Sequence, residues 1–380
     1  MKSKITFLAG VLFLITATGY AQHPGLVSTA KSPASQVSDE IAYVQKNGYP
    51  IVSALPNNYV KDGTVDYTAA IQQALNQHRL VIFPPFPVLI NDQGLTIHDY
   101  QEIYFPPGSM IQLMPSKKPG YEILRVHNVN HVKIFNPTIS GDKNQHLGQG
   151  GEWGMGISIR GATDVWVYHP RIENCWGDGI YIGDANIPYS KNVYISGGVI
   201  ANNRRNGISV IGADSLTIDS TVIARNIGTS PRGGIDIEPN TPRNVINHIL
   251  ISHVYTKENF GGILFGLKNM NNNKSPQSVH ISLINIADSG STYGLIIEKN
   301  SNNNGSKMNY ITGQVVIDTA TFIDNKKEPI GYEDYLASDS GPEYILSHIK
   351  IVKQKQDITI PYLQVLNQQI LNTSKIQIIQ

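Results

Sequence analysis

The sequence predicts an all-β solenoid, a single-stranded parallel β-helix with one α-helix capping its N-terminal end. Six short segments of the form Gly-Ile-x-Ile recur at spacings of 23, 28, 27, 28 and 32 residues. The first five are each followed by a second short apolar strand. A period of this length, with two or three short strands per unit, is typical of a solenoid. The six segments are residues 156–159, 179–182, 207–210, 234–237, 262–265 and 294–297.

The pattern excludes two other repeat architectures. The regular Leu and helical segment of leucine-rich repeats are missing, and a propeller blade needs about 40 residues or more. In a parallel β-helix the same position of each repeat returns beside itself at about 4.8 Å, so that inward Ile and Val side chains stack in columns. We expect about ten such coils between residues 80 and 350 at this strand spacing.

The segment before the coils predicts the capping helix. Asp66 is a suitable N-cap, and residues 66–78 carry an apolar stripe that would cover the open apolar end of the solenoid. Residues 80–83, followed by Pro84 and Pro85, are expected to form an early strand and its turn. The tail, residues 341–380, either adds the last coils or packs against the side of the solenoid. The stripe consists of Ala70, Ile71, Ala74 and Leu75.

The N-terminus has the pattern of a secretory signal peptide over residues 1–22. Lys2 and Lys4 precede a short apolar run, which ends in small residues near Ala21. The run is too short to span a membrane, and no other stretch reaches about 18 apolar residues. We therefore expect an exported protein without a transmembrane segment, with residues 23–60 as an N-terminal extension and residues 61–380 as the β-helix domain.

Composition excludes several other classes of protein. The chain has 30 Lys and Arg against 29 Asp and Glu, a net charge of +1, so there is no basic field for nucleic acid. One cysteine, Cys175, rules out an internal disulfide and a zinc site built from several cysteines. The hydrophobic content of 41% is too high for a disordered chain.

The capping segment and the coils together carry a family resemblance. The order Asp-x-Thr-x-Ala-Ile-Gln-x-Ala-Leu at residues 66–75, then Val-Ile-Phe-Pro-Pro at residues 81–85, then Gly-Ile-x-Ile coils resembles the pectate lyase superfamily of right-handed parallel β-helix proteins. The resemblance covers about residues 60–330. It implies a right-handed coil and an acidic or neutral polysaccharide as partner. It does not fix the reaction, because members include lyases, hydrolases, epimerases and phage tail-spike proteins.

Outward-facing positions of the repeats suggest where a site would lie. Alternate residues of a strand face the same side, so the third residue of each Gly-Ile-x-Ile segment faces outward. Polar and charged residues occupy this column in the first four repeats, and apolar ones follow. The contrast favours a functional surface on the first four coils. The column is Ser158, Tyr181, Ser209, Asp236, Leu264 and Ile296.

Charges of both signs alternate along these coils. Asp178 lies in the second repeat, Arg204 and Arg205 in the third, and Asp236 and Glu238 in the fourth. Adjacent coils are about 4.8 Å apart and the outer pair about 9.6 Å. The arrangement is either a groove in which an anionic sugar replaces a protein carboxylate on an arginine, or a salt-bridge ladder that only stabilises the coils.

A Gly-rich polar loop, residues 141–153, enters just before the first repeat, and binding residues concentrate on such loops. His146 and Glu152 offer acid or base groups. Trp153 and Trp176 offer flat surfaces for sugar rings, although corner packing would explain them equally well. Three further residues, Asp142, Arg160 and Arg232, are expected to contact substrate.

From these residues we expect a polysaccharide lyase that cleaves a uronic-acid-containing glycan by β-elimination. This reaction needs a group that neutralises the sugar carboxylate, a base and an acid. The resemblance implies Ca²⁺ held by carboxylates, for which Asp178, Asp236 and Glu238 are the candidate ligands. Arg204 or Arg205 would serve as base or carboxylate clamp. Tyr181 or His146 would be the second proton carrier.

Three alternatives stay open. An inverting glycoside hydrolase needs two carboxylates about 6.5–9.5 Å apart, which Asp178 with Asp236 or Glu238 approaches. Polygalacturonase-like hydrolases carry an Asp-Asp pair after a Gly, and here the second Asp is replaced by Gly179. A C5-epimerase shares the first step of the lyase. A non-catalytic glycan-binding rod would use the same groove without acid or base chemistry.

Overall fold

The computed structural model describes residues 33–270, 277–298, 311–332, 341–370 and 375–379. The chain divides into two compact units, Met1–Asp39 and Glu40–Gln380. The expected signal peptide, residues 1–22, lies outside the described residues. Helix α1, Pro33–Asn47, contains all the described residues of the first unit and crosses into the second. Within the described ranges, no helix is both long and apolar enough to cross a membrane.

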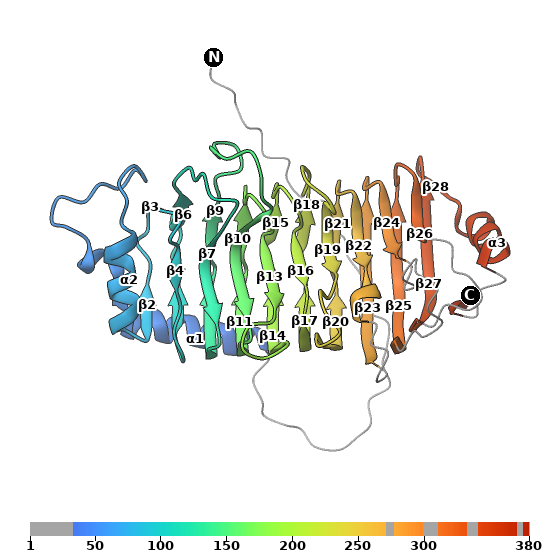
Figure 1. Ribbon diagram of the computed structural model, residues 1–380, viewed down its shortest axis with the longest axis horizontal. Coiled ribbons are helices and arrows are strands. Elements are labelled where there is room, and N and C mark those ends of the chain that lie inside the picture. Colours follow the sequence, from blue (N-terminus) through green and yellow to red (C-terminus); the bar gives the residue numbers. More distant parts are fainter. Residues whose placement is uncertain (1–32, 271–276, 299–310, 333–340, 371–374, 380) are drawn as a thin grey trace, which may run out of the picture. The chain divides into compact units, whose positions relative to one another are not determined.

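The second unit is a parallel β-helix, as the repeats predict (Figure 1). One strand of each coil joins a nine-stranded sheet whose neighbours follow chain order and pair in parallel. The coils are right-handed, the hand expected for parallel crossover connections. The nine strands are β4 (Leu95–Thr96), β7 (Gly120–His127), β10 (Trp153–Arg160), β13 (Ile180–Gly183), β16 (Ile208–Val210), β19 (Gly233–Ile237), β22 (Gly261–Phe265), β24 (Tyr293–Ile297) and β26 (Glu328–Tyr332).

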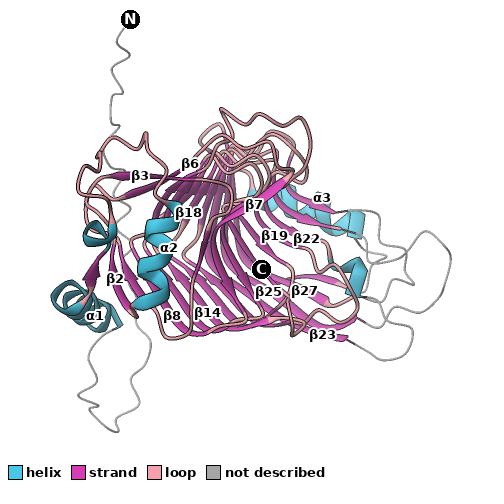
Figure 2. Ribbon diagram, turned by 60° about the vertical axis from the view of Figure 1, so that its left-hand side comes forward, coloured by secondary structure: helices cyan, strands magenta, loops and turns pink. Residues whose placement is uncertain are grey.

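A twenty-stranded sheet takes the other strands of the coils (Figure 2). One row of it is β2 (Leu80–Ile82), β5 (Glu102–Tyr104), β8 (Asn130–Phe135), β11 (Thr163–Tyr168), β14 (Ser190–Ser196), β17 (Ala213–Asp219) and β20 (Ile246–Ser252). The other row is β3 (Pro87–Ile90), β6 (Met110–Leu113), β9 (Thr138–Ser140), β12 (Arg171–Glu173), β15 (Val199–Ala201), β18 (Val222–Ala224) and β21 (Tyr255–Lys257). Both rows pair with the long strand β23 (Gln277–Ser289), after which β25 (Ile311–Ile323) and β27 (Glu343–Lys353) continue as single long strands.

The repeat sets the register because each Gly-Ile start returns to the same place. Ile157 pairs with Ile180, Ile180 with Ile208, and Ile208 with Ile235, and all are fully buried. The glycine before the strand is required by packing. A Cβ on Gly207 would come within 2.2 Å of Cγ2 of Ile223 in the core. Stacked aliphatic columns therefore fill the interior, which explains the low charge content of the chain.

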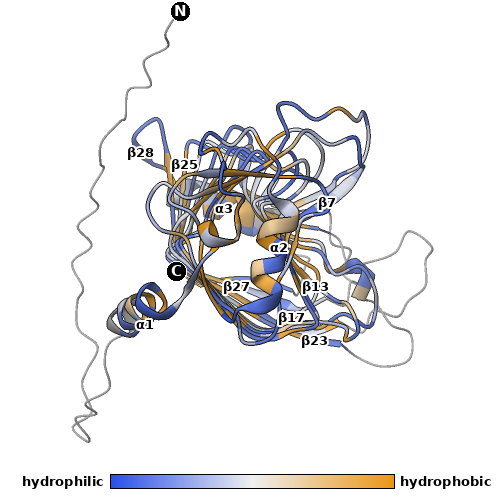
Figure 3. Cartoon of the chain, turned by 90° about the vertical axis from the view of Figure 1, so that its left-hand side faces the viewer, coloured by the Kyte–Doolittle hydropathy of each residue, from blue (hydrophilic) through white to orange (hydrophobic). Residues whose placement is uncertain are grey.

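Helix α2, Thr68–Gln77, forms the predicted cap and is slightly shorter than the expected range 66–78. The Asp66 carboxylate accepts hydrogen bonds from the backbone N–H and hydroxyl of Thr68, which sets the start of the helix. Ile71, Ala74 and Leu75 are buried, and Figure 3 shows apolar and polar stretches alternating along the helix. Strand β1 (Tyr49–Pro50), followed by the 3₁₀ helix η1 (Ile51–Ala54), pairs with β2. Pairing thus begins inside the segment 23–60 expected as an extension.

The C-terminal tail adds to the coils, which is the first of the two arrangements left open by the sequence. Strand β27 adds a coil, and β29 (Ile376–Ile379) pairs with it in parallel. Between them lie β28 (Gln356–Asp357), which is antiparallel to β27, and helix α3 (Thr359–Ile370), whose Leu363 and Leu366 join the core. A second 3₁₀ helix, η2 (Leu267–Met270), follows β22.

Candidate active site

The polar column predicted from the repeats lies on the outer face of the nine-stranded sheet. Ser158 pairs with Tyr181, Tyr181 with Ser209, and Ser209 with Asp236. Leu264 and Ile296 continue the column, as expected. Because the flanking isoleucines point into the core, this column must face outward.

Arg205 lies on this face, just before β16, and contacts four carboxylates. Its Nη1 donates a hydrogen bond to Oδ2 of Asp178 at 3.0 Å. Nη2 lies 3.5 Å from Oε2 of Glu238 and 3.9 Å from Oδ2 of Asp236. Nε lies 3.7 Å from Oε2 of Glu152. The alternation of charges expected along the coils is present, and all of it converges on one guanidinium group.

Exposure divides the four carboxylates into two kinds. The side chain of Asp178 is completely buried and that of Asp236 is 3% exposed. The side chains of Glu152 and Glu238 are 38% and 29% exposed. The aspartates therefore hold Arg205 in place, and the two glutamates are the carboxylates that a ligand can reach.

Burial and crowding of charge perturb these groups. Burial raises the pKa of Asp236 well above its ordinary value, and the neighbouring charge of Glu238 adds to the rise. Burial also raises the pKa of Glu238, against the attraction of Arg205. Burial raises the pKa of Asp178 as well, although Arg205 and Ser209 oppose it. The four carboxylates, Asp178 first, outweigh burial and raise the pKa of Arg205.

Asn206 connects these groups and was not singled out from the sequence. Its Nδ2 donates to Oδ2 of Asp236 at 2.8 Å and to Oγ of Ser209 at 3.0 Å. Its backbone N–H donates to Oδ1 of Asp178 at 3.0 Å, and its Oδ1 accepts from the Gly233 N–H at 2.7 Å. Ser209 donates in turn to Oδ2 of Asp178 at 2.8 Å. The position of Asn206 between Arg205 and Gly207, at the start of a coil, is the sequence signal that could have identified it.

Trp176 is enclosed by two other candidate residues, which corrects its expected role. The His146 ring stacks on it at 3.8 Å between ring centroids, and the guanidinium carbon of Arg204 lies 3.8 Å from the ring centroid. Two groups this close to one centroid must lie on opposite faces, because on one face they would overlap. Neither face of Trp176 is free for a sugar ring. Arg204 also donates to the carbonyl of Gly151 at 2.6 Å, so it anchors the loop.

His146 and Asp142 belong to a buried hydrogen-bond network next to Trp176. Nδ1 of His146 lies 2.8 Å from Oδ2 of Asp142, and both side chains are completely buried. Oδ1 of Asp142 accepts from the Tyr121 hydroxyl at 2.5 Å, and that hydroxyl accepts from the Trp176 N–H at 2.9 Å. The expectation that His146 carries protons and Asp142 contacts substrate is therefore corrected. The two residues hold the loop and do not reach a ligand in this arrangement.

A second cluster adjoins the site on β7 and β10. Trp153, 56% exposed, lines a groove of about 500 Å³ together with Lys118, Arg125 and Arg160. Arg160 is paired with Glu122 at 3.1 Å. Arg125 donates to neutral oxygens, the Gln93 carbonyl and the Thr96 hydroxyl, and no carboxylate of the described residues pairs with it. Sequence reasoning found Trp153 and Arg160 and missed Arg125 and Glu122, which precede the first recognised repeat.

Tyr181 and Arg232 occupy other positions. The Tyr181 ring is 6% exposed and packs against Met155 and Ile211, with the Arg160 guanidinium 4.0 Å from its centroid. Burial raises the pKa of Tyr181. Arg232 lies over the Phe260 ring, with its guanidinium carbon 4.5 Å from the ring centroid. Neither residue joins the four carboxylates.

The three candidate calcium ligands do not fit a calcium site. Among the described residues, no group of three or more His, Cys, Asp or Glu side chains is arranged to hold a metal ion. Asp178, Asp236 and Glu238 all face Arg205, which supplies positive charge where the ion was expected. The calcium dependence that the resemblance implies is a matter for a chelation experiment.

Known proteins resemble this chain in sequence over about half of its length. No family model matches the sequence. Two uncharacterized proteins of Bacillus subtilis strain 168 are 26% identical to it: YclG over 220 residues, which is 50% of this chain and 38% of YclG, and the SPbeta prophage-derived YorA over 218 residues, 53% and 34%. This chain therefore spans little more than a third of the length of each.

Solved structures are similar at low identity. The endo-xylogalacturonan hydrolase of Aspergillus tubingensis has a TM-score of 0.56 at 14% identity, over 78% of this chain and 83% of that one. An ι-carrageenase complexed to ι-carrageenan fragments has a TM-score of 0.51 at 10% identity, over 73% of each chain. At such identities the likeness shows the fold alone. The chain has the pectin-lyase-like right-handed parallel β-helix fold.

Proposed function

We propose that this protein is an exported glycan-acting enzyme and that it hydrolyses its substrate with a pair of glutamates. One observation carries the proposal: Arg205 is held by four carboxylates from three other coils, and two of them, Glu152 and Glu238, reach solvent. A structural ladder needs only paired charges. Here the carboxylates outnumber the arginine, which leaves acid and base groups for chemistry.

The positions of the two glutamates allow the carboxylate spacing of an inverting hydrolase. Both approach the same rigid guanidinium fork, Glu152 at 3.7 Å and Glu238 at 3.5 Å. The fork therefore limits the separation of their oxygens to less than about 10 Å. Inverting enzymes place the two carboxyl groups about 6.5–9.5 Å apart, so that a water molecule fits between base and sugar.

The roles follow from the environment of each group. Glu238, whose pKa is raised by burial, is the general acid that gives its proton to the glycosidic oxygen as the bond to the anomeric carbon breaks. Glu152 is the base that takes a proton from the attacking water, whose oxygen forms the new bond to that carbon. Arg205 and Asn206 hold the acid Glu238 and the neighbouring aspartates in place.

The groove on β7 and β10 supports a glycan substrate. Trp153 offers an exposed ring, and Arg125 offers a positive charge without a carboxylate partner among the described residues. Such a groove suits a sugar that bears an acidic group. The two solved structures named above are, by name, an endo-xylogalacturonan hydrolase and an ι-carrageenase bound to ι-carrageenan fragments, and they lend support at the level of fold.

β-Elimination remains the second candidate, favoured by Arg125. An arginine without a carboxylate partner can neutralise the uronate carboxylate, as that reaction requires. Arg205 is less suited to this task because four protein carboxylates already surround it.

The test is turnover by the purified protein on pectic, alginate, sulfated galactan and neutral plant polysaccharides. We expect new reducing ends without the ultraviolet absorbance of an unsaturated uronate, and an anomeric configuration opposite to that of the substrate. Rising absorbance would identify a lyase instead. Binding without either signal across the panel would identify a non-catalytic glycan-binding rod.

A further inference from the structure

A second binding groove lies on the same outer face, beyond the carboxylates. Strand pairing puts Asp178, Asn206, Gly233, Gly261 and Tyr293 in one outward column along successive coils. The two glycines in the middle carry no side chain, and the apolar side chains of Leu264 and Ile296 lie over them, so this stretch between the site and Tyr293 is apolar. Tyr293 on β24 lies two coils from β19, the strand of Asp236, a separation of about 10 Å.

The groove is built from tyrosines. It has a volume of about 550 Å³ and is lined by Tyr293 and Tyr332 of the sheet and by Tyr362 of α3. The Tyr293 ring lies over Gly331, where a Cβ would come within 2.8 Å of its Cδ1. The Tyr362 hydroxyl donates to the Ile330 carbonyl at 3.1 Å and accepts from the Ile330 N–H at 3.3 Å, which fixes its ring.

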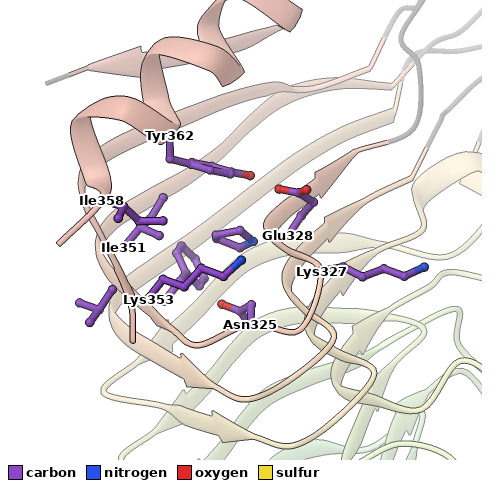
Figure 4. Close-up of a pocket in the computed structure, with 10 residues that line it drawn as sticks. Asn325, Lys327, Glu328, Ile351, Lys353, Ile358 and Tyr362 are labelled. Atoms are coloured by element: carbon purple, nitrogen blue, oxygen red, sulfur yellow. The ribbon is translucent and has the colours of Figure 1, made fainter. Parts of the chain in front are cut away.

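Polar acceptors border these rings. Figure 4 shows the Tyr362 hydroxyl from α3 and the Glu328 carboxylate from β26 pointing toward one another above a smaller pocket of about 90 Å³. Both residues also line the tyrosine groove. In the smaller pocket Nδ2 of Asn325 is committed to Oδ1 of Asp288 at 2.5 Å, and its Oδ1 is buried without a hydrogen-bond partner. An unpaired buried acceptor requires a donor.

We propose that the tyrosine groove binds uncharged sugar rings of the glycan that the carboxylates cleave, an inference that rests on the proposed function. Aromatic faces with a few acceptors suit a neutral, hydroxyl-rich ring. Glu328, the charged residue among those lining the groove, would repel a uronate or sulfate, and Nζ of Lys327, outside this lining, lies 5.8 Å from the Tyr293 ring centroid. The cationic groove at Arg125 lies on the other side of Arg205. The substrate is therefore a mixed chain, acidic toward β7 and neutral toward β26.

The test is calorimetric binding of a neutral xylohexaose, a neutral galactohexaose and a hexagalacturonate to the full protein. Wild type is expected to bind at least one neutral hexaose. Tyr293→Ala should weaken that binding about tenfold, which corresponds to about 1.4 kcal/mol, because the ring face that the sugar covers is removed. Tyr293→Phe should retain binding, because the ring face is unchanged. Tyr194→Ala, on β14 of the other sheet, is the matched control and should bind as wild type does.

The inference is overturned if wild type binds neither neutral hexaose, or if Tyr293→Ala and wild type bind with equal affinities. The catalytic proposal fails separately. A Glu238→Gln variant should lose turnover and keep neutral-sugar binding. If binding depends on Tyr293 but wild type turns over no polysaccharide, the hydrolase proposal is rejected and the binding groove is retained. If turnover of a substrate does not increase when neutral sugar residues are added to it, the groove proposal is rejected and the hydrolase proposal is retained.

Discussion

Nδ2 of Asn206 lies 2.8 Å from Oδ2 of Asp236 and donates a hydrogen bond to it. The bond favours the charged form of an aspartate whose pKa burial and the charge of Glu238 raise. Asn206 therefore tunes the coupled pair Asp236 and Glu238 without touching a ligand itself, and we regard it as a positioning residue.

Replacing Asn206 tests this role. Asn206→Ala removes the donor, so the pKa of Asp236 should rise further. A protonated Asp236 lowers the pKa of its partner Glu238, so the alkaline limb of the pH–rate profile, which follows Glu238, should move to lower pH. Asn240→Ala, on the exposed loop after β19, is the control and should leave the profile in place. A loss of activity with both limbs unmoved would show that Asn206 is merely structural.

Removing the proposed acid should abolish turnover while the fold persists. Glu238→Gln keeps the shape of a side chain that is 29% exposed and removes its proton, for which we expect a loss of about 10²- to 10⁴-fold in kcat. Glu343→Gln on β27 is the matched control. Thermal unfolding should be similar for both variants, and full activity in Glu238→Gln would eliminate it as the acid.

Arg205→Ala should destabilise the protein as well as inactivate it. The side chain of Asp178 is completely buried against the guanidinium group. Removing one partner of a buried ion pair costs about 3–5 kcal/mol, since a charge is left without compensation. Denaturant unfolding measures this loss, and Arg205→Lys should recover part of it. A change below about 1 kcal/mol would contradict the arrangement, because that is the range of exposed pairs.

Asp288 predicts a pH-dependent stability. Burial raises its pKa to about 6 from 3.8, against hydrogen bonds from Ser291, Thr256 and Asn325. The folded state then binds the proton more tightly than the unfolded state. The stabilisation that protonated Asp288 gives the folded state is complete below about pH 4. It is lost as pH rises to about 6, a change in the free energy of unfolding on the order of 3 kcal/mol.

Asp288→Asn should remove this dependence. We expect the variant to gain free energy of unfolding relative to wild type at pH 7.5 and little at pH 4, measured by denaturant titration at both values. Equal differences at the two pH values would show that Asp288 does not titrate in this window.

Metal removal should leave the enzyme active. Because Arg205 faces Asp178, Asp236 and Glu238, dialysis against EDTA is expected to change neither turnover nor the thermal unfolding midpoint. Activity that falls with EDTA and returns with Ca²⁺ would restore the calcium expectation.

The sequence by itself determined the solenoid and the register of its outer face. Each Gly-Ile start must return to one corner of the coil, and alternation within a strand then dictates which side chains point outward. It also held a signal for α3 that was not used: Asp357 accepts from the Thr359 N–H and hydroxyl, the same Asp-x-Thr start that Asp66 and Thr68 provide for α2.

Only the tertiary structure decided which candidates act together. Arg205 and Glu152 are 53 positions apart in the chain, and Tyr293 on β24 and Tyr362 on α3 are 69 positions apart. His146, Trp176 and Asp142 have the residue types of a catalytic site, yet the loop folds them inward onto Arg204 and Tyr121. Periodicity fixes where a residue stands on its coil. Burial depends on what loops and neighbouring coils place over it, which no local pattern records.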